Sequence, residues 1–306
     1  MFDKLLKPRF PTCAVGLEND AAAVVQLERA RSGYVIKRAA SIDLSPDALQ
    51  PSFSQSNLPD PDALATALSD LTTSAGLLRQ RKWSVTLPEA TTRCAILTIE
   101  GGGSRHEIEE VLQWKIERNF GAPTSELRIS REQLSPNDQK QARYLVTAIH
   151  LSVLAEYESV FAALGWQAGL LLPRHVGEEQ WLRQSDAGDG LLLSAHAEGF
   201  TAVLLRNNRP LTLRTVFCEI AECDDELHRV LLFYRERLGK NGNAASVSRL
   251  MVLGDRLDKN RVAEIAQETL GVSLKPLMAA DVGLTIPGDL PFDSIAAPAG
   301  AARLAW

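Results

Sequence analysis

Cysteine is scarce in this chain, which has 306 residues and only four cysteines: Cys13, Cys94, Cys218 and Cys223. No two of them form a Cys-x-x-Cys pair, and the histidines do not accompany them at the spacing of a zinc site. This pattern excludes a disulfide framework and a zinc-ribbon type of site. We interpret the cysteines as reduced thiols in the strands of a cytoplasmic protein.

Long apolar runs and an excess of positive charge are also missing. No window approaches the roughly eighteen apolar residues of a membrane-spanning helix, so we expect no direct membrane span. The 33 Lys and Arg against 38 Asp and Glu give a net charge of −5, which argues against a nucleic-acid partner. We interpret the densest basic run, Arg79–Lys82, as a solvated helix end, and Met1–Phe10, which lacks a signal core, as a frayed leader.

What the sequence does contain is a duplicated pattern. Thr12–Leu44 and Gly190–Val216 each read as an apolar strand, a short polar tip, a second alternating strand, a turn and a third strand. This predicts two antiparallel three-strand meanders, with the second tip at Ala195–Gly199. Each meander is followed by an amphipathic helix and another strand, which predicts two α/β lobes with a cleft between them. The hairpin tips that would face the cleft are poor in glycine.

The middle of the chain has a pattern of its own. Residues 89–150 predict a small β-α-β-β subdomain whose helix, Ser104–Phe120, begins with a capping box and ends at Gly121. We therefore divide the chain into residues 1–88 (first lobe), 89–150 (inserted α+β subdomain), 151–187 (return to the first lobe and crossover) and 188–306 (second lobe). The lobe boundary is placed in the polar segment Ser185–Gly190, which is predicted to be a hinge.

Three expectations concern the crossover and the end of the chain. Arg174–Arg183 predicts a crossover helix, and Val272–Leu277 predicts a strand of the second lobe. Thr285–Pro298 is rich in proline, glycine and aspartate, which predicts irregular structure. Ala299–Trp306 follows with one or two expected helical turns.

Several short segments, taken in order, resemble the PilM-type assembly proteins of type IV pili. The related cytoplasmic domain of GspL-type secretion proteins shares this resemblance, and both belong to the actin-like superfamily that includes FtsA. The segments cover most of the chain: Val15–Leu17 with Val24–Leu27, Ser84–Pro88, Glu107–Asn119, Tyr144–Ala148, Gly165–Ala168 and Met251–Gly254. The resemblance implies an α/β fold of the actin-like, ribonuclease H-like kind, with two duplicated lobes and a small inserted subdomain.

The resemblance also identifies the positions where this family binds a nucleotide. There, glycines let backbone N–H groups approach phosphate, and aspartates hold hydrated Mg²⁺. The matching positions in this chain are Glu18, Asp20, Ala21, Ser194, His196 and Gly254. The first tip has neither the family's glycine nor its serine, while Ser194 and His196 stand for an aspartate and a glycine. Asp255 replaces the second glycine of the turn that accommodates the purine.

These replacements predict that the chain neither hydrolyses ATP nor binds it tightly, because added acids repel a triphosphate and few donors remain to hold it. The resemblance then implies a noncatalytic, pseudo-ATPase scaffold without ATP, Mg²⁺ or another metal as a cofactor. Its place would be the cytoplasmic side of the inner-membrane platform of a type IV pilus or type II secretion-like machine, peripheral to the membrane. The implied partner is the cytoplasmic N-terminal tail of a PilN-type single-pass membrane protein, held between the first lobe and the inserted subdomain. The pilus assembly ATPase is a further implied partner.

Other functions stay open at this point. An active ATP-binding ATPase of the same family would need the missing glycines, and a GspL-like secretion adaptor would share the scaffold role. A sugar or acetate kinase would need better phosphate loops and a carboxylate facing an acceptor hydroxyl. An FtsA-type cell-division protein would need an amphipathic membrane helix, for which Ala299–Trp306 is too short.

Three local patterns have both a functional and a structural interpretation. Glu18 with Asp20 resembles a cation cage, but solvated turn residues are the better interpretation. His196 with Glu198 resembles an acid–base pair, but a turn histidine is the better interpretation. Gly101–Gly103 precedes a helix, as in a phosphate-binding loop. Acidic residues in the first turns of that helix disfavour an anion, so we interpret it as a capped helix only.

Overall fold

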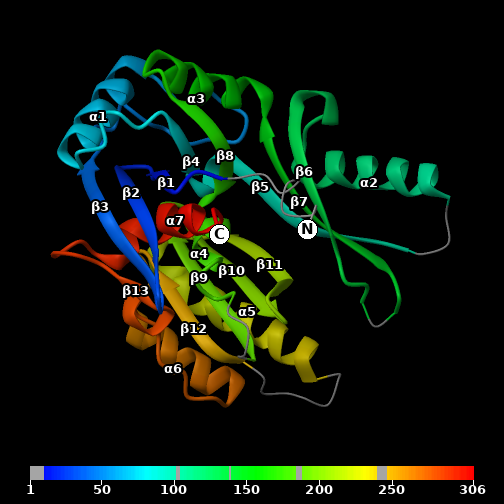
Figure 1. Ribbon diagram of the computed structural model, residues 1–306. Helices are drawn as coiled ribbons and strands as arrows, with labels where there is room; N and C mark the ends of the chain where they lie inside the picture. Colours follow the sequence, from blue (N-terminus) through cyan, green and yellow to red (C-terminus); the bar gives the residue numbers. More distant parts are fainter. Residues whose placement is uncertain (1–9, 101–103, 138, 184–187, 240–246) are drawn as a thin grey trace.

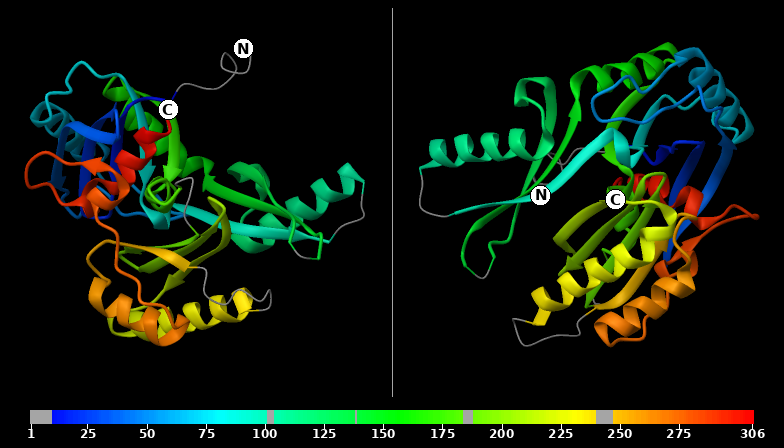
Figure 2. Two further views of the ribbon diagram at one scale, coloured as in Figure 1. Left: turned by 60° about the horizontal axis from the view of Figure 1, so that its bottom comes forward. Right: turned by 180° about the vertical axis from the view of Figure 1, so that it is seen from behind.

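The computed structural model describes residues 10–100, 104–137, 139–183, 188–239 and 247–306, and these form three sheets (Figure 1). The strand orders are β13-β3-β2-β1-β4-β8, β11-β10-β9-β12 and β5-β7-β6. Two further views show the smallest sheet, with its helix, projecting from the body that the other two sheets build (Figure 2). None of the described helices is both long and apolar enough to cross a membrane.

The first sheet contains the first predicted meander. Its strands are β1 (Cys13–Leu17), β2 (Ala21–Ala30), β3 (Gly33–Asp43), β4 (Lys82–Leu87), β8 (Gln167–Pro173) and β13 (Leu284–Thr285). Helices α1 (Pro61–Ser74) and α3 (Leu151–Ala163) pack on it through one buried cluster that includes Leu68, Tyr157 and Val85. Helix α1 begins after Asp60, whose carboxylate caps it by accepting a hydrogen bond from the Ala63 N–H at 2.9 Å.

The second sheet repeats this topology. Its strands are β9 (Asp189–His196), β10 (Gly199–Arg206), β11 (Arg209–Phe217) and β12 (Val247–Leu253), and its helices are α5 (Cys223–Gly239) and α6 (Lys259–Leu270). Strands β9, β10 and β11 form the meander, and β12 runs parallel to β9 as β4 runs parallel to β1. The duplication predicted from the sequence is confirmed.

Two details of the second lobe correct the sequence analysis. Strand β9 continues through Ala195 and His196, so the tip is shorter than the predicted Ala195–Gly199. Val272–Leu277 is not a strand, since only an isolated bridge joins Pro276 to Leu250. The predicted hinge is described only in part: residues 185–187 lie outside the described ranges, and Asp189 and Gly190 open β9.

The inserted subdomain matches its prediction. It consists of β5 (Thr92–Ile99), α2 (Arg105–Phe120), β6 (Leu127–Leu134) and β7 (Ala142–His150). The capping box of Ser104 and Glu107 is present, and Gly121 ends α2 in the left-handed conformation that glycine adopts readily. Helix α2 covers one face of the sheet through a cluster that includes Leu97, Ile116 and Val146.

The end of the chain is where the expectation of irregular structure is wrong. Helix α7 runs over Phe292–Arg303 and lies in the middle of the molecule between the two larger sheets (Figure 1). It contains residues 292–298, which were expected to be irregular, and it confirms the helical turns expected from Ala299. Its alanines are buried with residues of both sheets in one cluster. Strand β13 pairs with β3, Leu284 opposite Tyr34, so the end of the chain returns to the first sheet. The predicted assignment of residues 188–306 to the second lobe does not include this return.

The crossover helix α4 (Arg174–Glu179) is shorter than predicted and packs against α7 without room for side chains. A Cβ atom on Gly300 would collide with the carbonyl oxygen of Gly177, and one on Gly177 with that of Ala297. The indole N–H of Trp181 donates to the Ala296 carbonyl at 2.8 Å, which fixes the two segments together.

We expect Gly300→Ala to lower the free energy of unfolding by about 1–3 kcal/mol, because the methyl group would force the α4–α7 contact apart. Chemical denaturation measures this. The matched control is Gly190→Ala, whose new Cβ would have no neighbour nearer than 3.5 Å and should change stability by less than about 0.5 kcal/mol. Equal stabilities of the two variants would contradict the close contact.

Candidate functional site

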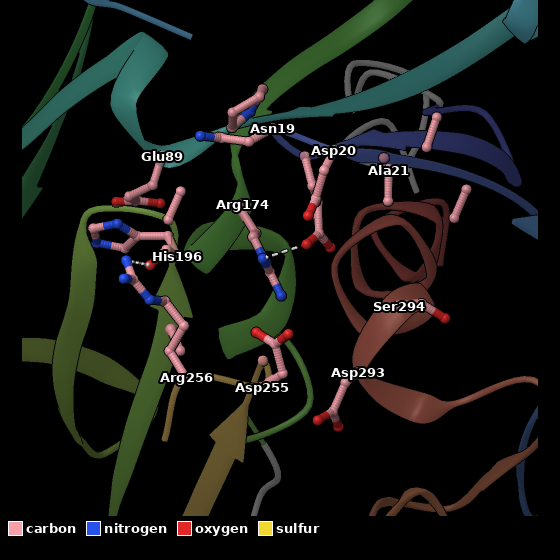
Figure 3. Close-up of a pocket in the computed structure, with 18 of the residues that line it drawn as sticks. Asn19, Asp20, Ala21, Glu89, Arg174, His196, Asp255, Arg256, Asp293 and Ser294 are labelled. Carbon is pink, nitrogen blue, oxygen red and sulfur yellow. Dashed lines mark hydrogen bonds and ion pairs between the residues drawn. The ribbon is translucent and has the colours of Figure 1, made fainter. Parts of the chain in front are cut away.

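A cleft of about 720 Å³ opens where strands of the two larger sheets end (Figure 3). Its walls are the tip after β1, the end of β9, the turn after β12, the turn after β4, the first residue of α4 and the start of α7. Strands β1, β4 and β8 are parallel, as are β9 and β12, so their carboxyl ends meet at this cleft. Ligands of α/β proteins commonly bind at such an edge.

The cleft brings together most of the residues that the sequence analysis singled out. Glu18, Asp20, Ala21, His196 and Gly254 all line it. Ser194 does not, because its side chain is fully buried within the second sheet, where its hydroxyl has no hydrogen-bond partner. The role of these positions as nucleotide-loop remnants stays a prediction.

Backbone geometry requires a glycine at position 254, and it uses one backbone N–H donor of the first tip. Gly254 has a φ of +89°, and a Cβ there would lie 2.8 Å from the carbonyl oxygen of Ala195, so only glycine lets β12 end this close to β9. At the first tip, the Glu18 N–H donates to the Ala21 carbonyl at 2.8 Å. That donor is used inside the turn and does not point at a ligand.

Carboxylates dominate the charge of the cleft. Six line it, Glu18, Asp20, Asp43, Glu89, Asp255 and Asp293, against the guanidinium groups of Arg174 and Arg256. Arg174 is already committed to two carboxylates, at 2.7 Å from Glu18 and 2.8 Å from Glu178. The cleft therefore carries an excess of negative charge.

Burial and neighbouring acids together raise the pKa of Glu18. Burial raises its pKa to about 7, and although Arg174 opposes the shift, the acids Glu178, Asp20 and Asp255 add to it. The Glu18 side chain, 28% exposed, is thus close to half protonated near neutral pH. Its pairing with Arg174 also makes the cation cage once considered for Glu18 and Asp20 a poor description of the tip.

This shift predicts how stability depends on pH. Because the folded pKa of Glu18 is raised from 4.5 to about 7, the folded state binds more protons in that interval and loses stability as the pH rises through it. We expect Glu18→Gln to gain about 2 kcal/mol relative to the native chain between pH 5 and pH 8, less than the full shift implies because the group is partly solvated.

Urea denaturation at several pH values measures the Glu18 effect. The control is Glu28→Gln, since Glu28 is exposed and pairs only with Lys37 at the surface. This surface change should cost less than about 1 kcal/mol. A Glu18→Gln difference that does not change between pH 5 and pH 8 would contradict the raised pKa of Glu18.

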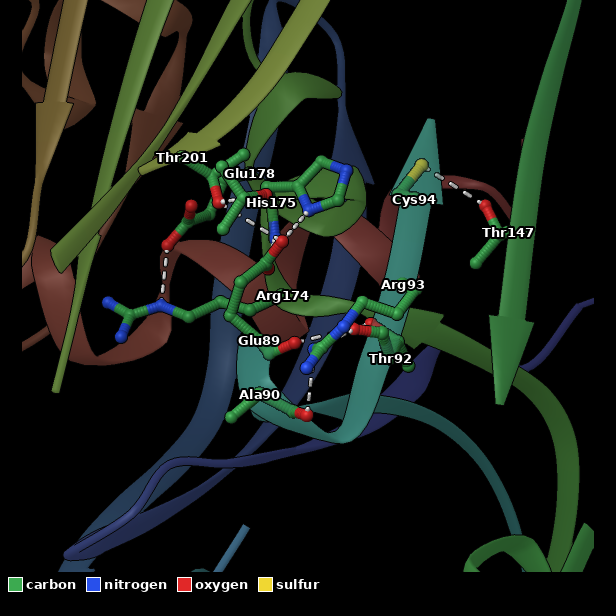
Figure 4. Close-up of polar contacts among 11 residues, drawn as sticks. Glu89, Ala90, Thr92, Arg93, Cys94, Thr147, Arg174, His175, Glu178 and Thr201 are labelled. Atoms are coloured by element: carbon green, nitrogen blue, oxygen red, sulfur yellow. Dashed lines mark hydrogen bonds and ion pairs between the residues drawn. The ribbon is translucent and has the colours of Figure 1, made fainter. Parts of the chain in front are cut away.

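A buried hydrogen-bond network is centred on Glu89 at the wall of the cleft (Figure 4). Its carboxylate is 2.7 Å from Nδ1 of His175 and accepts a hydrogen bond from the Thr201 hydroxyl at 3.2 Å. Burial alone would raise the pKa of Glu89, but the charge and hydrogen bond of His175 outweigh it and lower the pKa to about 2. The network joins the turn after β4, helix α4 and strand β10 of the second lobe.

His196, which also lies near Glu89, is uncharged. Burial lowers its pKa to about 4 in spite of nearby Glu89, so the imidazole is neutral at physiological pH. Its Nε2 atom is buried without a hydrogen-bond partner. In the described part of the chain His196 and Glu198 form no ion pair, so an acid–base pair of these two residues has no support in the geometry.

The sequence analysis missed Glu89, Arg174 and His175. A signal was present, because Glu89 follows β4 by one proline and Arg174 directly follows β8, and charged residues at the carboxyl ends of parallel strands often face a cleft. Within the described ranges, no group of three or more His, Cys, Asp or Glu is placed to hold a metal ion.

The duplicated sheets, their covering helices and the cleft between them define an actin-like fold. A chain of a PilM–PilN type IV pilus biogenesis complex is similar to this protein, with a TM-score of 0.76 and 19% identity over 97% of this chain and 99% of that chain. The resemblance to PilM-type proteins drawn from the sequence is thereby confirmed at the level of the fold.

Two other solved structures are also similar over nearly their whole lengths. One is a protein of actin-like ATPase fold from Bacteroides thetaiotaomicron, with a TM-score of 0.51 and 10% identity over 97% of this chain and 98% of that chain. The other is the cytoplasmic domain of EpsL, an inner-membrane component of the type II secretion system of Vibrio cholerae. Its TM-score is 0.49, and its identity is 11% over 96% of this chain and 93% of that chain. No protein-family model and no curated protein matches the sequence.

Proposed function

We propose that this protein is a noncatalytic scaffold of a type IV pilus or type II secretion-like assembly platform, and that it binds the cytoplasmic tail of a PilN-type membrane protein. The observation that carries this proposal is the similarity over the full length to a chain of a PilM–PilN complex. In this role the protein is cytoplasmic and attached to the inner membrane through its partners. Contact with the pilus assembly ATPase is a further part of the proposal.

The residues of the cleft support the noncatalytic part. ATP carries about four negative charges, which Mg²⁺ only partly neutralises, and the cleft offers mostly carboxylates. Asp255 stands next to Gly254, where a phosphate or ribose would need space and donors, and Arg174 is occupied by Glu18 and Glu178. These residues do not fit Mg·ATP, so no step of the proposed function uses it.

The inserted sheet supplies a surface for an extended partner. Ile96 and Leu145 lie directly opposite each other on β5 and β7, and side-chain alternation places them on the face that α2 does not cover. Both are half-buried and belong to none of the buried clusters. On the same face Arg143 donates to the Leu211 carbonyl of β11. We place the tail against this face, where alternate side chains of a strand-like peptide can pack.

The direct test is calorimetric titration of the purified chain with a synthetic PilN-type cytoplasmic tail. Saturable binding at one site is expected. No detectable binding, with a tail shown to be intact and soluble, would contradict the proposal. A scrambled tail of the same composition is the control for nonspecific association.

A further inference from the structure

The edge of the first sheet that lies away from the cleft carries a cluster of cations. We call it the basic edge and define it by Arg38 of β3, Leu78, Arg79 and Arg81 of the α1–β4 connection, and Lys82 of β4. All five side chains are exposed, in a protein whose net charge is −5. Four positively charged side chains therefore gather on one surface of a chain whose net charge is negative.

The cations of the basic edge are not neutralised by neighbours. Within the described residues, no carboxylate lies within ion-pair distance of Arg38, Arg79, Arg81 or Lys82. The one nearby surface pair, Lys37 with Glu28, is internally balanced. Two guanidinium groups are held by backbone carbonyls instead, Arg38 by Gly76, and Arg81 by Leu78 at 2.9 Å. These bonds fix the positions of the charges without cancelling them.

A hollow and an exposed aliphatic side chain accompany these charges. Gln26, Arg38 and the segment 76–80 line a depression of about 460 Å³. Leu78 stands on its rim with 57% of its surface exposed. An exposed leucine surrounded by arginines is the arrangement by which a protein inserts an apolar side chain among lipid headgroups.

The start of the described chain lies at the same edge. Strands β1, β4 and β8 are parallel, so their amino ends share this edge, where Pro11 packs against Gly169 of β8. The nine residues before Phe10 contain Lys4, Lys7 and Arg9 together with Phe2, Leu5 and Leu6. Cationic and apolar residues are thus also combined in the sequence that enters the fold here.

We propose that the basic edge is a docking surface for a membrane rich in anionic phospholipid. Lipid phosphates would pair with the guanidinium and ammonium groups that no carboxylate neutralises, and Leu78 would enter the interfacial region of the bilayer. A nucleic acid or an acidic peptide would match the charge, but neither explains an exposed aliphatic side chain at the centre of the cluster. This proposal replaces the interpretation of Arg79–Lys82 as a solvated helix end.

The test is flotation of the whole chain, without any partner, on phosphatidylcholine vesicles with and without phosphatidylglycerol. We expect binding only to the vesicles with phosphatidylglycerol, weakening as salt is raised. Replacing Arg79, Arg81 and Lys82 by Gln should reduce the partition about a hundredfold, since each cation contributes about fivefold at such a surface. Leu78→Ser alone should reduce it about tenfold, and Arg79→Lys with Arg81→Lys should retain it.

The matched control removes equal charge elsewhere, through Gln at Arg118, Arg128 and Arg209, which are exposed on the inserted subdomain and the second lobe. It should bind as the native chain does. The proposal is overturned if the native chain does not float with phosphatidylglycerol at low salt, or if the control triple loses binding equally. Capture of polyglutamate without vesicle flotation would overturn it in favour of an acidic polypeptide. Because no PilN tail is used, these outcomes are separate from those of the proposed function.

Discussion

Replacing Glu89 by alanine is expected to lower the free energy of unfolding by about 3–5 kcal/mol, the cost of removing one partner from a buried ion pair. Glu89 is 6% exposed and His175 is fully buried. Loss of the carboxylate would leave the His175 Nδ1 and the Thr201 hydroxyl without the acceptor they now share. Because the network joins both lobes, we expect a lower Tm for the whole chain in calorimetry.

A double variant separates this pair from general packing. His175→Leu added to Glu89→Ala should cost less than the sum of the two single changes by about 1–3 kcal/mol, because both charges are then gone. The surface pair supplies the control, since Glu28→Ala should cost less than about 1 kcal/mol. Strict additivity of the two buried changes would show that the pair is not coupled.

The stabilisation by the Glu89–His175 pair depends on pH at both ends. The folded pKa of Glu89 is lowered from 4.5 to about 2, so the contribution of its carboxylate is present above pH 4.5 and disappears as the pH falls towards 2. Burial opposes the charge of His175, but Glu89 outweighs it and raises the pKa of His175 well above 6.5, so the contribution of the imidazolium is present below pH 6.5 and declines at higher pH. The difference between the native chain and Glu89→Ala should therefore be largest between pH 4.5 and pH 6.5 and should shrink as the pH falls towards 2.

Introducing aspartate at both Ile96 and Leu145 is expected to weaken binding of the PilN-type tail by more than about a hundredfold. Two apolar contacts at the centre of a peptide interface are each worth about 1–2 kcal/mol, and a buried carboxylate without a partner adds a penalty. Since both side chains are only half-buried and outside the core clusters, the subdomain should still fold. Calorimetry and circular dichroism on the same samples measure the two effects.

The matched control for this surface is Val111→Asp. Val111 is 40% exposed on α2, the helix that covers the opposite face of the same sheet. It introduces the same chemical change in the same subdomain and should leave the affinity within about twofold. Equal losses from both changes would place the tail elsewhere or point to a general effect of charge.

Local patterns explain which parts of the fold were predictable. The meanders follow from alternating residues and polar turns, and α2 from its caps, because these signals act over a few residues. Only the end of helix α7 was predicted, through the helical turns expected from Ala299. Its first half was missed because Pro298 inside the helix and the nearby proline, glycine and aspartate residues oppose the helix preference of its alanines. The helix packs against the bare backbone of Gly177, a contact that lies far away along the chain. Sequence patterns do not report such tertiary contacts.

The residues of the cleft were likewise predictable only in part. The resemblance to PilM-type proteins located the six nucleotide-loop positions, and five of them line the cleft together. Arg174 and His175 are adjacent in sequence and face different networks, with Glu18 and Glu178 on one side and Glu89 on the other. Glu178 is only four residues from Arg174, but Glu18 and Glu89 lie far from α4 along the chain, so only the placement of α4 between the two lobes reveals these two partners.

The central claim is that shape rather than nucleotide chemistry is the working property of this fold. Titration calorimetry of the native chain with Mg·ATP, followed by the PilN-type tail in its presence and absence, tests this claim most directly. We predict no saturable heat from Mg·ATP at millimolar concentration and the same tail affinity under both conditions. Micromolar binding of Mg·ATP that is lost when Glu18 and Asp20 are both changed to alanine would contradict the account.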